Sequence, residues 1–422
     1  MILLLLAGIV ACGSGDARQP PADPEAGQAR EQGEPERPVL PGIDVLLQDS
    51  VHLVRSLRAG LVTNQTGIDR DRVSAIDRLA GSEEVELVAL FSPEHGIRGE
   101  AEAGVRVEGE TDSRTGLPVH SLYGSTLKPT PEMLNGLDVL LFDIQDIGTR
   151  YYTYIYTMAY AMEAAGEADI PLVVLDRPNP IGGAAVHGNV LDPAFSSFVG
   201  MYPLPIRHGM TPGELARLFR DRESIDVELH VVPVQQWRRD MSFDDTGLPW
   251  VPPSPNMPSV ESALHYPGTC LFEGTSLSVG RGTDAAFQQF GAPWLDGALL
   301  AERLNAYDLP GVGFEAVRFT PENPGDGKFG GQDVEGVRFV SEFSASGTAY
   351  DPVLAGVAAV IEARRMSGER FTWRTAHFDR LAGTDRLRLG ILDGRSAFEL
   401  RDGWMAELAA FRELREGYLI YP

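Results

Sequence analysis

From about residue 39 onward, short apolar runs alternate with segments that have the spacing of amphipathic helices. The apolar runs occupy residues 59–67, 85–96, 117–124, 137–154, 170–180 and 227–237. Helical spacing follows at 73–81, 154–168 and 211–219. Uninterrupted apolar runs are typical of strands covered on both faces, and their alternation with helices favours parallel pairing. We therefore predict an α/β fold with a Rossmann-like, doubly wound and mostly parallel sheet.

The proline-rich segment at 250–259, WVPPSPNMPS, interrupts this alternation. Proline lacks a backbone donor, so no regular helix or strand is expected at that density. We place a domain boundary shortly after this segment, near residue 262. The sequence then predicts a Rossmann-like domain at 39–262 and a second, smaller α+β domain at 263–422.

The N-terminal stretch 1–12, MILLLLAGIVAC, is too short to span a bilayer as a helix but is typical of a signal peptide. Its last four residues resemble a bacterial lipobox, in which Cys12 is lipidated after cleavage. Residues 13–38 offer almost nothing to bury, so we expect a disordered tether. We expect an exported lipoprotein on the periplasmic or cell-surface side of a membrane, which it contacts through the lipid anchor only. A cytoplasmic protein with an apolar N-terminus is the alternative.

Polar side chains gather where the predicted strands end. Asn64, Glu94, Asp143, Gln145 and Asn179 each follow an apolar run. In an open parallel sheet the carboxyl ends of the strands form the edge where ligands bind, so these residues should line one crevice. The alternative is that each belongs to an ordinary turn or helix cap. That alternative is weaker for Glu94 and His95, which are poor turn formers.

Glu94 is the leading candidate for an acid. A carboxyl group between a dry strand end and a loop can have its pKa raised by desolvation, and an acid protonated near neutral pH can donate to a leaving oxygen. His95 can orient that acid, act itself, or form a structural hydrogen bond. Joint metal binding by Glu94 and His95 is unfavoured, because adjacent turn residues seldom face one ion.

Two further polar clusters could contact a ligand. The first forms the later part of the segment at 137–154 and contains Asp143, Gln145, Asp146, Arg150, Tyr151, Tyr152 and Tyr154. Carboxylates and amides suit sugar hydroxyls, and tyrosine rings suit sugar C–H faces; an Asp–Arg pair bracing a turn is the alternative. The second, FEGTSLSVGRGTD at 272–284, places three glycines near Glu273 and Arg281, and backbone can approach a ligand there. A surface loop without function is its alternative. His208, in RHG, is a less specific candidate.

Composition narrows the classes of partner. A formal net charge of -24 argues against nucleic acid, because binding a polyanion needs a basic surface. Neither G-x-G-x-x-G after the first strand nor G-x-x-x-x-G-K-[ST] occurs. The predicted Rossmann-like order of strands and helices therefore does not imply that a nucleotide binds. The two cysteines, Cys12 and Cys270, do not form a zinc-type cluster. We expect no metal and no cofactor.

A series of motifs carries a resemblance from about residue 43 to the end. These are TNQTG, FSPEHGIRGE, FDIQDIGTRYYTY, LDRPNP, RHGMTPGE, PPSPNMP, YPGTCLFEGT and GRGTD. Together they resemble the exo-acting β-N-acetylmuramidases of the NamZ type, glycoside hydrolase family 171. The resemblance implies an active site on the Rossmann-like domain, with the C-terminal domain completing the cleft. It also implies removal of terminal N-acetylmuramic acid from the non-reducing ends of peptidoglycan fragments. The family's proposed catalytic glutamate lies in S-P-E-H-G and corresponds here to Glu94.

This chemistry fits the residues. Glycoside cleavage uses an acid and usually a second carboxylate, for which Asp143, Asp146, Asp176 and Glu273 are candidates. A nucleophile, a water-activating base and assistance by the substrate's N-acetyl group all stay open. The lactyl carboxylate of muramic acid is assigned to Arg150 or Arg281. In full, the catalytic candidates are Glu94, His95 and Asp143, and the substrate-binding candidates are Asn64, Gln145, Arg150, Tyr151, Asn179, His208, Glu273 and Arg281.

Two other functions compete with this hypothesis. The first is a metal-dependent amidase or esterase acting on cell-wall peptides through His95, His208 and an aspartate. Activity lost to a chelator and restored by zinc would favour it. The second is a lipoprotein that binds muropeptides in the same cleft without cleaving them. Tight binding without product release would favour that function.

Overall fold

The structure is a computed structural model that describes residues 38–93, 96–98, 111–341 and 349–422. Residues Pro38–Pro422 form one compact unit. Cys12 and residues 13–37 of the predicted tether precede this unit and lie outside the described residues. Within the described ranges, we find no helix with the length and apolar character needed to cross a membrane.

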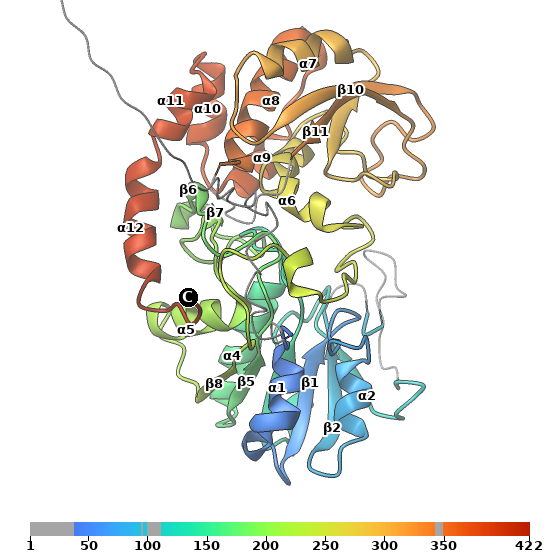
Figure 1. Cartoon of the computed structure of the whole chain (residues 1–422), viewed down its shortest axis with the longest axis vertical. Coiled ribbons are helices and arrows are strands. Elements are labelled where there is room, and N and C mark those ends of the chain that lie inside the picture. Colours follow the sequence, from blue (N-terminus) through green and yellow to red (C-terminus); the bar gives the residue numbers. More distant parts are fainter. Residues whose placement is uncertain (1–37, 94–95, 99–110, 342–348) are drawn as a thin grey trace, which may run out of the picture. The chain divides into compact units, whose positions relative to one another are not determined.

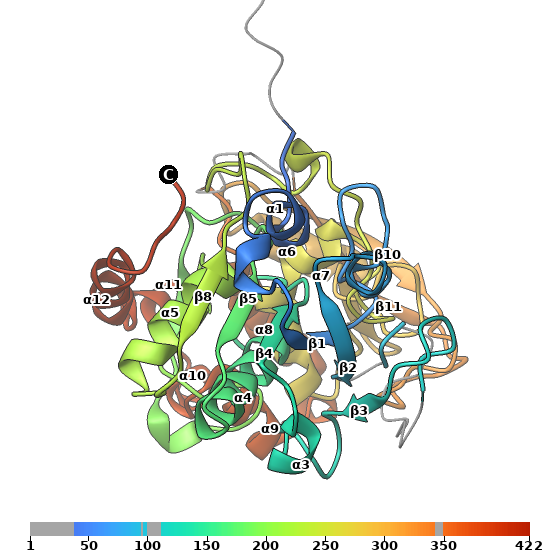
Figure 2. The same cartoon turned by 90° about the horizontal axis from the view of Figure 1, so that it is seen from below.

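A six-stranded sheet forms the base of the unit (Figure 1). Its spatial order is β3-β2-β1-β4-β5-β8, and every neighbouring pair is parallel. Figure 2 shows the strands side by side in this order. The strands are β1 (Arg58–Thr63), β2 (Glu86–Ser92), β3 (Val119–Ser121), β4 (Val139–Asp143), β5 (Leu172–Leu175) and β8 (Leu229–Val232). The predicted parallel sheet is confirmed, and each of the six apolar runs contains one of its strands.

Alternate side chains of each strand enter different hydrophobic cores. In β4, Leu140 and Phe142 join the core formed with α4 and α5, whereas Val139 and Leu141 join the core formed with α1 and α2. Helices therefore cover both faces of the sheet, which explains why the strands read as unbroken apolar runs. These helices are α1 (Gly42–Asp49), α2 (Ala75–Ala80), α3 (Pro131–Leu134), α4 (Tyr154–Glu167) and α5 (Pro212–Arg222).

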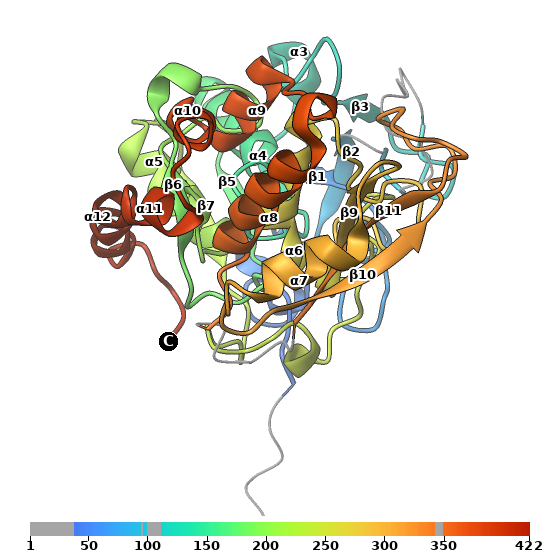
Figure 3. The same ribbon diagram turned by 90° about the horizontal axis from the view of Figure 1, so that it is seen from above.

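A smaller C-terminal domain contains an antiparallel sheet of order β10-β11-β9. Its strands are β9 (Gln289–Ala292), β10 (Gly313–Phe319) and β11 (Val334–Val340). Figure 3 shows α7 lying along this sheet beside α8. The helices of this part are α6 (Val260–Thr269), α7 (Gly297–Asn305), α8 (Pro352–Ser367), α9 (Thr375–Ala382), α10 (Arg386–Leu392), α11 (Ala397–Asp402) and α12 (Met405–Arg415). The smaller α+β domain is confirmed; its exact start near residue 262 stays a prediction, and α6 runs through that position.

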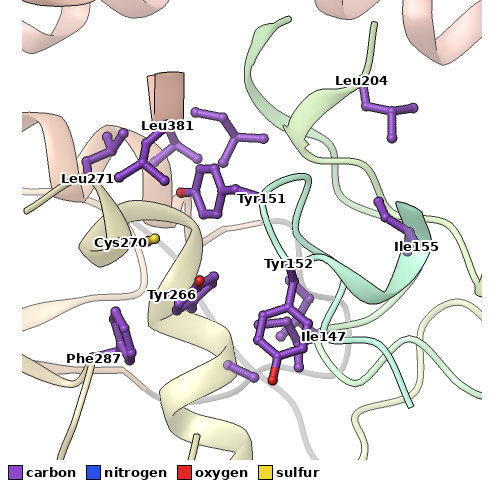
Figure 4. Packing of buried hydrophobic residues seen from close by; sticks show 14 of the residues in the cluster. Ile147, Tyr151, Tyr152, Ile155, Leu204, Tyr266, Cys270, Leu271, Phe287 and Leu381 are labelled. Atoms are coloured by element: carbon purple, nitrogen blue, oxygen red, sulfur yellow. The ribbon is translucent and has the colours of Figure 1, made fainter. Parts of the chain in front are cut away.

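One hydrophobic core joins the two parts. It includes Ile147, Tyr151 and Ile155 from the N-terminal part together with Tyr266 and Leu381 from the C-terminal part (Figure 4). The short antiparallel hairpin of β6 (His187–Val190) and β7 (Pro205–Arg207) lies beside α8 and α12. Because this core is shared, the relative position of the two parts is fixed by packing and not by a linker.

The chain end returns to the parallel sheet. Helix α12 runs beside β6, and the last residues reach the region of α5 (Figure 1). The hydroxyl of Tyr421 donates to Asp176 at the end of β5 and accepts from the backbone N–H of Val234. Its ring packs edge-on against Trp237, with ring centroids 5.0 Å apart. The sequence analysis assigned this segment to the second domain only, so its contact with the first sheet is a new finding.

Candidate active site

The topological switch point of the sheet lies between β1 and β4, where ligands commonly bind in such folds. Here hydrogen bonds close it. The Thr63 hydroxyl donates to the Asp143 carbonyl (2.7 Å), and the Gln145 N–H donates to the Thr66 hydroxyl (2.9 Å). Asn64 accepts both the N–H and the hydroxyl of Thr66 through its Oδ1. A cavity of about 10 Å³ remains beside Thr66 and Gln145, which is room for roughly one water. The structure therefore gives Asn64 and Gln145 a role in closing this end of the sheet.

Asp143 is clamped by an arginine from the neighbouring strand end. Arg177 donates from Nε to Oδ1 (2.5 Å) and from Nη2 to Oδ2 (2.9 Å), and Asp143 is completely buried. The same Nη2 also donates to the carbonyl of Ile68. Because Asp143 is fully buried and both of its oxygens accept from the Arg177 fork, its carboxylate is closed off from a sugar or a bulk water. The geometry favours a role for Asp143 in fixing the turn over the expected catalytic role.

Asn179 and Asp176 are also held internally. Asn179 donates to the carbonyl of Met210 and accepts the N–H of Ile181. Its amide packs against Gly148, where a Cβ would lie 2.4 Å from Asn179 Oδ1 and where φ is 80°. Glycine is therefore required at this turn. Asp176 accepts from Thr211, Gly213, Arg177 and Tyr421. The polar atoms of both residues are therefore used within the protein, where they organise the sheet edge.

Arg150 lies at the junction of the two parts and is completely buried. Its Nη1 donates to the carbonyls of Asn189 (3.0 Å) and Leu204 (2.9 Å). Its Nη2 donates to the carbonyls of Leu381 (2.9 Å) and Ala382 (2.8 Å) in the C-terminal domain. Burial lowers the pKa of the guanidinium to about 10. With both terminal nitrogens committed to backbone oxygens, Arg150 cannot also hold a substrate carboxylate, and the sequence-based assignment to this residue is corrected.

His208 is completely buried, and its proton position follows from its partner. Nδ1 accepts the N–H of Met210 at 3.2 Å, so the proton is on Nε2. Nε2 lies 3.9 Å from Asp146 Oδ2, too far for a direct hydrogen bond. Burial, with the charges of Arg415, Arg207 and Arg150, lowers the pKa of His208 to about 3. A neutral, enclosed imidazole supports the fold and is not placed to contact substrate as the sequence suggested.

Asp146 differs from the other strand-end carboxylates. Its Oδ2 accepts the N–H of Gly148 at 2.6 Å, and its Oδ1 is buried without a hydrogen-bond partner among the described residues. Burial raises the pKa of Asp146 to about 7. Of the aspartates that follow β4 and β5, this is the one whose carboxyl group is not held by an arginine or by several donors.

Asp146 should make stability depend on pH. Its folded pKa of about 7 exceeds the ordinary value of 3.8, so the folded state binds more protons between these values. Its contribution to the free energy of unfolding is therefore fully present below about pH 4 and is lost as the pH rises toward about 7. Asp146→Asn removes this titration. Between pH 5 and pH 8 the free energy of unfolding in urea should therefore fall for the wild type relative to the variant, by on the order of 2 kcal/mol. Stability curves that stay parallel across this range would contradict the assignment.

Glu94 and His95 lie outside the described residues, so their side chains are not placed. The strand before them is described. Phe91 and Ser92 end β2 and are buried, and Ser92 pairs with Ser121 of β3. The ring of Phe91 lies 5.2 Å from that of His120. Because β2 is parallel to its neighbours, its carboxyl end lies at the same edge of the sheet as the turns of β1 and β4.

A pocket of about 220 Å³ lies where the two parts meet. Its wall is formed by Tyr151, Tyr152, Thr153, Tyr154, Val199, Ser254, Asn256, Met257, Tyr266, Arg281 and Phe287. The Tyr151 hydroxyl donates to the carbonyl of Pro267, and its ring packs edge-on against Tyr266. Figure 4 shows Tyr151, Tyr152, Tyr266 and Phe287 converging from the two parts. Tyr151 and Arg281, two of the substrate-binding candidates, thus line the same pocket.

Arg281 enters this pocket with its position fixed by Glu273. Its Nε donates to Glu273 Oε1 at 2.5 Å, and the guanidinium lies 5.1 Å from the ring centre of Phe287. Burial alone would lower the pKa of Arg281. The charge of Glu273 and its hydrogen bond together have the larger effect, so the pKa is raised. The side chain is 23% exposed, and no described residue forms a hydrogen bond with Nη1 or Nη2. Arg281 therefore presents two donors to an anionic ligand.

The sequence analysis missed part of this pocket. Ser254, Asn256 and Met257 belong to the proline-rich segment that was treated only as a boundary. The carbonyl of Pro253 accepts from both Tyr154 (2.6 Å) and Gln65, so the segment is tied to the strand-end turns. A polar Asn within a run of prolines was the available signal, because proline stiffens a loop and can position one side chain. Tyr266 carried no such signal.

The residues that the structure describes include no group of three His, Cys, Asp or Glu side chains that could hold a metal. Cys270, the cysteine of the described part, is buried with Sγ 3.7 Å from Glu273 Oε2. Burial and the neighbouring Glu273 raise the pKa of its thiol. This thiol is consequently kept protonated behind the pocket wall.

Comparison with known proteins gives the family of the chain. Residues 59–261 match the model of the N-terminal domain of exo-β-N-acetylmuramidase NamZ, and residues 264–421 match that of its C-terminal domain. The chain belongs to the NamZ family. A curated relative, the peptidoglycan β-N-acetylmuramidase NamZ of Bacillus subtilis (strain 168), is 47% identical over 384 residues, which cover 91% of each chain.

Two crystal structures of DUF1343 family proteins from Bacteroides fragilis have the same fold as this NamZ family chain. The first has a TM-score of 0.84 and 37% identity, and covers 92% of this chain and 100% of that chain. The second has a TM-score of 0.74 and 32% identity, with coverage of 91% and 99%. The similarity thus extends over both parts of the unit, including the C-terminal domain.

Proposed function

We propose that this protein hydrolyses the β-glycosidic bond that links terminal N-acetylmuramic acid to the rest of a peptidoglycan fragment, acting at the non-reducing end. The observation that carries the proposal is membership of the NamZ family over nearly the whole chain, together with 47% identity to a peptidoglycan β-N-acetylmuramidase. The pocket between the two parts of the unit supports it.

The size and lining of the pocket suit one sugar. Its volume of about 220 Å³ lies below the roughly 300–1,000 Å³ of pockets for drug-sized ligands, so it has room for a single terminal residue. An enzyme that acts on chain ends needs such a restricted site. The rings of Tyr151 and Tyr266 can pack against the C–H faces of the sugar, and the amide of Asn256 can hydrogen-bond its hydroxyl groups.

Glu94 is the proposed general acid. In the sequence it comes two residues after Ser92, which ends β2, and the carboxyl end of β2 lies at the same sheet edge as those of β1 and β4. Of the four candidates for a second carboxylate, Asp143 and Asp176 have their oxygens occupied by protein donors. Asp146 and Glu273 stay as candidates, because one oxygen of the first has no partner in the described part of the chain and the second adjoins the pocket through Arg281.

The lactyl carboxylate of muramic acid is assigned to Arg281. Its Nε is held by Glu273, its side chain lines the pocket, and no described residue hydrogen-bonds its terminal nitrogens, which leaves the planar end of the guanidinium for a carboxylate. This contact would distinguish muramic acid from N-acetylglucosamine, which has no lactyl group.

Arg281→Gln should therefore weaken discrimination between the two sugars. We expect kcat/KM for an aryl β-N-acetylmuraminide to fall about 10- to 100-fold, mainly through KM, because a charge-assisted hydrogen bond contributes roughly 1.5–3 kcal/mol. The slow turnover of the corresponding glucosaminide should change little. Arg281→Lys should retain part of the preference because its charge is kept. Equal losses on both sugars would show that Arg281 does not recognise the lactyl group.

For the cellular location, we propose that Cys12 carries a lipid and anchors the enzyme to a membrane on the periplasmic or cell-surface side. The support is the apolar segment that ends in IVAC. Metabolic labelling with a fatty acid should mark the wild type and not Cys12→Ser, and the variant should leave the membrane fraction.

The function is tested with purified protein and two substrates, an aryl β-N-acetylmuraminide and a peptide-free saccharide with N-acetylmuramic acid at its non-reducing end. The expected product is free N-acetylmuramic acid, identified by mass spectrometry, with one terminal sugar released per cleavage. Tight binding of the saccharide without release would overturn the proposal. Release of peptide in place of sugar, abolished by a chelator and restored by zinc, would instead establish an amidase.

A further inference from the structure

A second hollow lies on the antiparallel sheet of the C-terminal domain. Its volume is about 640 Å³, larger than that of the pocket that contains Arg281. It is lined by Gly282, Thr283, Asp284, Gln289, Val317, Arg318, Phe319, Thr320, Glu322 and Arg338. No role has been given so far to any of these residues, and we call this hollow the sheet groove.

The sheet groove occupies the face of the sheet that α7 leaves open. Directly paired residues share a face, so Phe314 with Phe339 marks one face and Glu315 with Arg338 marks the other. Phe314 and Phe339 are buried in the main core, to which Leu300 and Leu304 of α7 also belong. Val317, Phe319 and Arg338 alternate onto the opposite face and are only partly buried. Their side chains are therefore available to a ligand.

One loop separates the sheet groove from the proposed sugar pocket. Arg281 lines the pocket, and the next two residues, Gly282 and Thr283, line the groove. This loop is fixed by the N–H of Glu322, which donates to the carbonyl of Gly282 at 2.8 Å. At Gly282 φ is 78° and a Cβ would lie 2.4 Å from the Glu322 carbonyl oxygen, so only glycine is accommodated. The two hollows thus share a rigid wall.

The lining of the sheet groove has the mixed character that suits a sugar chain. Val317 and Phe319 give an apolar surface for sugar C–H faces. Beside them, Arg338 Nη2 donates to Gln289 Oε1 (3.2 Å), and Gln289 Nε2 donates to the Thr283 hydroxyl (3.1 Å). The Nε of Arg338 is buried and has no partner among the described residues. These side chains provide a row of polar groups along an apolar surface.

We propose that the sheet groove binds the saccharide that remains after the scissile bond, that is, the leaving part of the peptidoglycan fragment. The inference rests on the proposed function, because it assumes that the terminal sugar occupies the pocket beside Arg281. An enzyme that removes one terminal sugar must place the rest of the chain outside the pocket. The sheet groove is the adjoining hollow whose volume and lining accommodate further sugars.

The test compares substrates that do and do not reach the sheet groove. An aryl β-N-acetylmuraminide has no sugar beyond the scissile bond, whereas peptide-free di- and tetrasaccharides do. We expect Arg338→Gln and Phe319→Ala to raise KM for the tetrasaccharide about tenfold and to leave kcat/KM for the aryl substrate within twofold. Arg303→Gln is the matched control, because Arg303 belongs to α7 on the opposite face of the sheet and is 45% exposed.

The outcomes separate this inference from the function itself. Failure of the wild type to release N-acetylmuramic acid from the aryl substrate would overturn the function. Release by the wild type, with variants that affect all substrates equally or none, would overturn only the role of the sheet groove. A rise in KM confined to peptide-bearing saccharides, absent for peptide-free ones of the same length, would also overturn it by showing that the groove holds peptide. Aryl activity of each variant reports that it has folded.

Discussion

Glu94→Gln should lower kcat for release of N-acetylmuramic acid by about 10²- to 10⁴-fold, the range that general acid catalysis provides. Glutamine keeps the shape of the side chain but has no proton to give to the leaving oxygen. The loss should be largest for a saccharide substrate, because a sugar alkoxide needs protonation as it leaves. It should be much smaller for an aryl substrate whose leaving phenol is acidic.

Glu86→Gln is the matched control for this experiment. Glu86 begins the strand that Glu94 follows, at the opposite end of β2, and its side chain is 62% exposed. This variant should retain full activity on both substrates. If Glu94→Gln turns over the saccharide at a rate near that of the wild type, position 94 is not the acid. If both substrates lose activity equally, Glu94 acts in some way other than protonating the leaving group.

Arg177→Met should cost about 3–5 kcal/mol of unfolding free energy. Arg177 holds both oxygens of the fully buried Asp143, so its removal leaves an uncompensated carboxylate between β4 and β5. Urea unfolding followed by far-UV circular dichroism measures the loss. The double variant Asp143→Leu with Arg177→Met should recover much of it, since an apolar pair leaves no buried charge unpaired.

A surface pair provides the comparison for this prediction. Arg55 and Glu84 also form an ion pair, but their side chains are 56% and 49% exposed. Arg55→Met should cost no more than about 1 kcal/mol, because water and salt screen an exposed pair. Equal costs for Arg177→Met and Arg55→Met would mean that burial of Asp143 does not control the energetics of the strand-end turn.

The parallel sheet could be predicted because its signal is local. The four central strands are covered on both faces, so Val139 to Phe142 of β4 read as one apolar run although they enter two different cores. The hydrogen-bonding partners of the strand-end residues could not be predicted in this way. Arg177 follows Asp143 by 34 positions, and the sequence gives no indication that the two form a fork.

The same limit explains the two arginines. Arg150 and Arg281 are alike as residue types, and each has a carboxylate nearby in the sequence. Their roles differ because of contacts made at long range: Arg150 meets the carbonyls of Leu381 and Ala382, more than 200 positions away, whereas Arg281 is held by Glu273 on one side and keeps the other side open. Only the folded arrangement of the two parts separates an arginine whose terminal nitrogens are all used within the protein from one that lines a pocket.

The return of the chain end to the first sheet has a consequence for biosynthesis. Tyr421 is the penultimate residue, and it supplies a donor to Asp176 and covers Trp237. The carbonyl of Pro422, the final residue, accepts the N–H of Arg239 at 3.0 Å. Residues 38–262 leave the ribosome before Tyr421 is made, so the contacts at the end of β5 are completed only after the C-terminal domain has also been synthesised. Removal of Tyr421 and Pro422 would therefore uncover Trp237 and leave Asp176 without one of its donors.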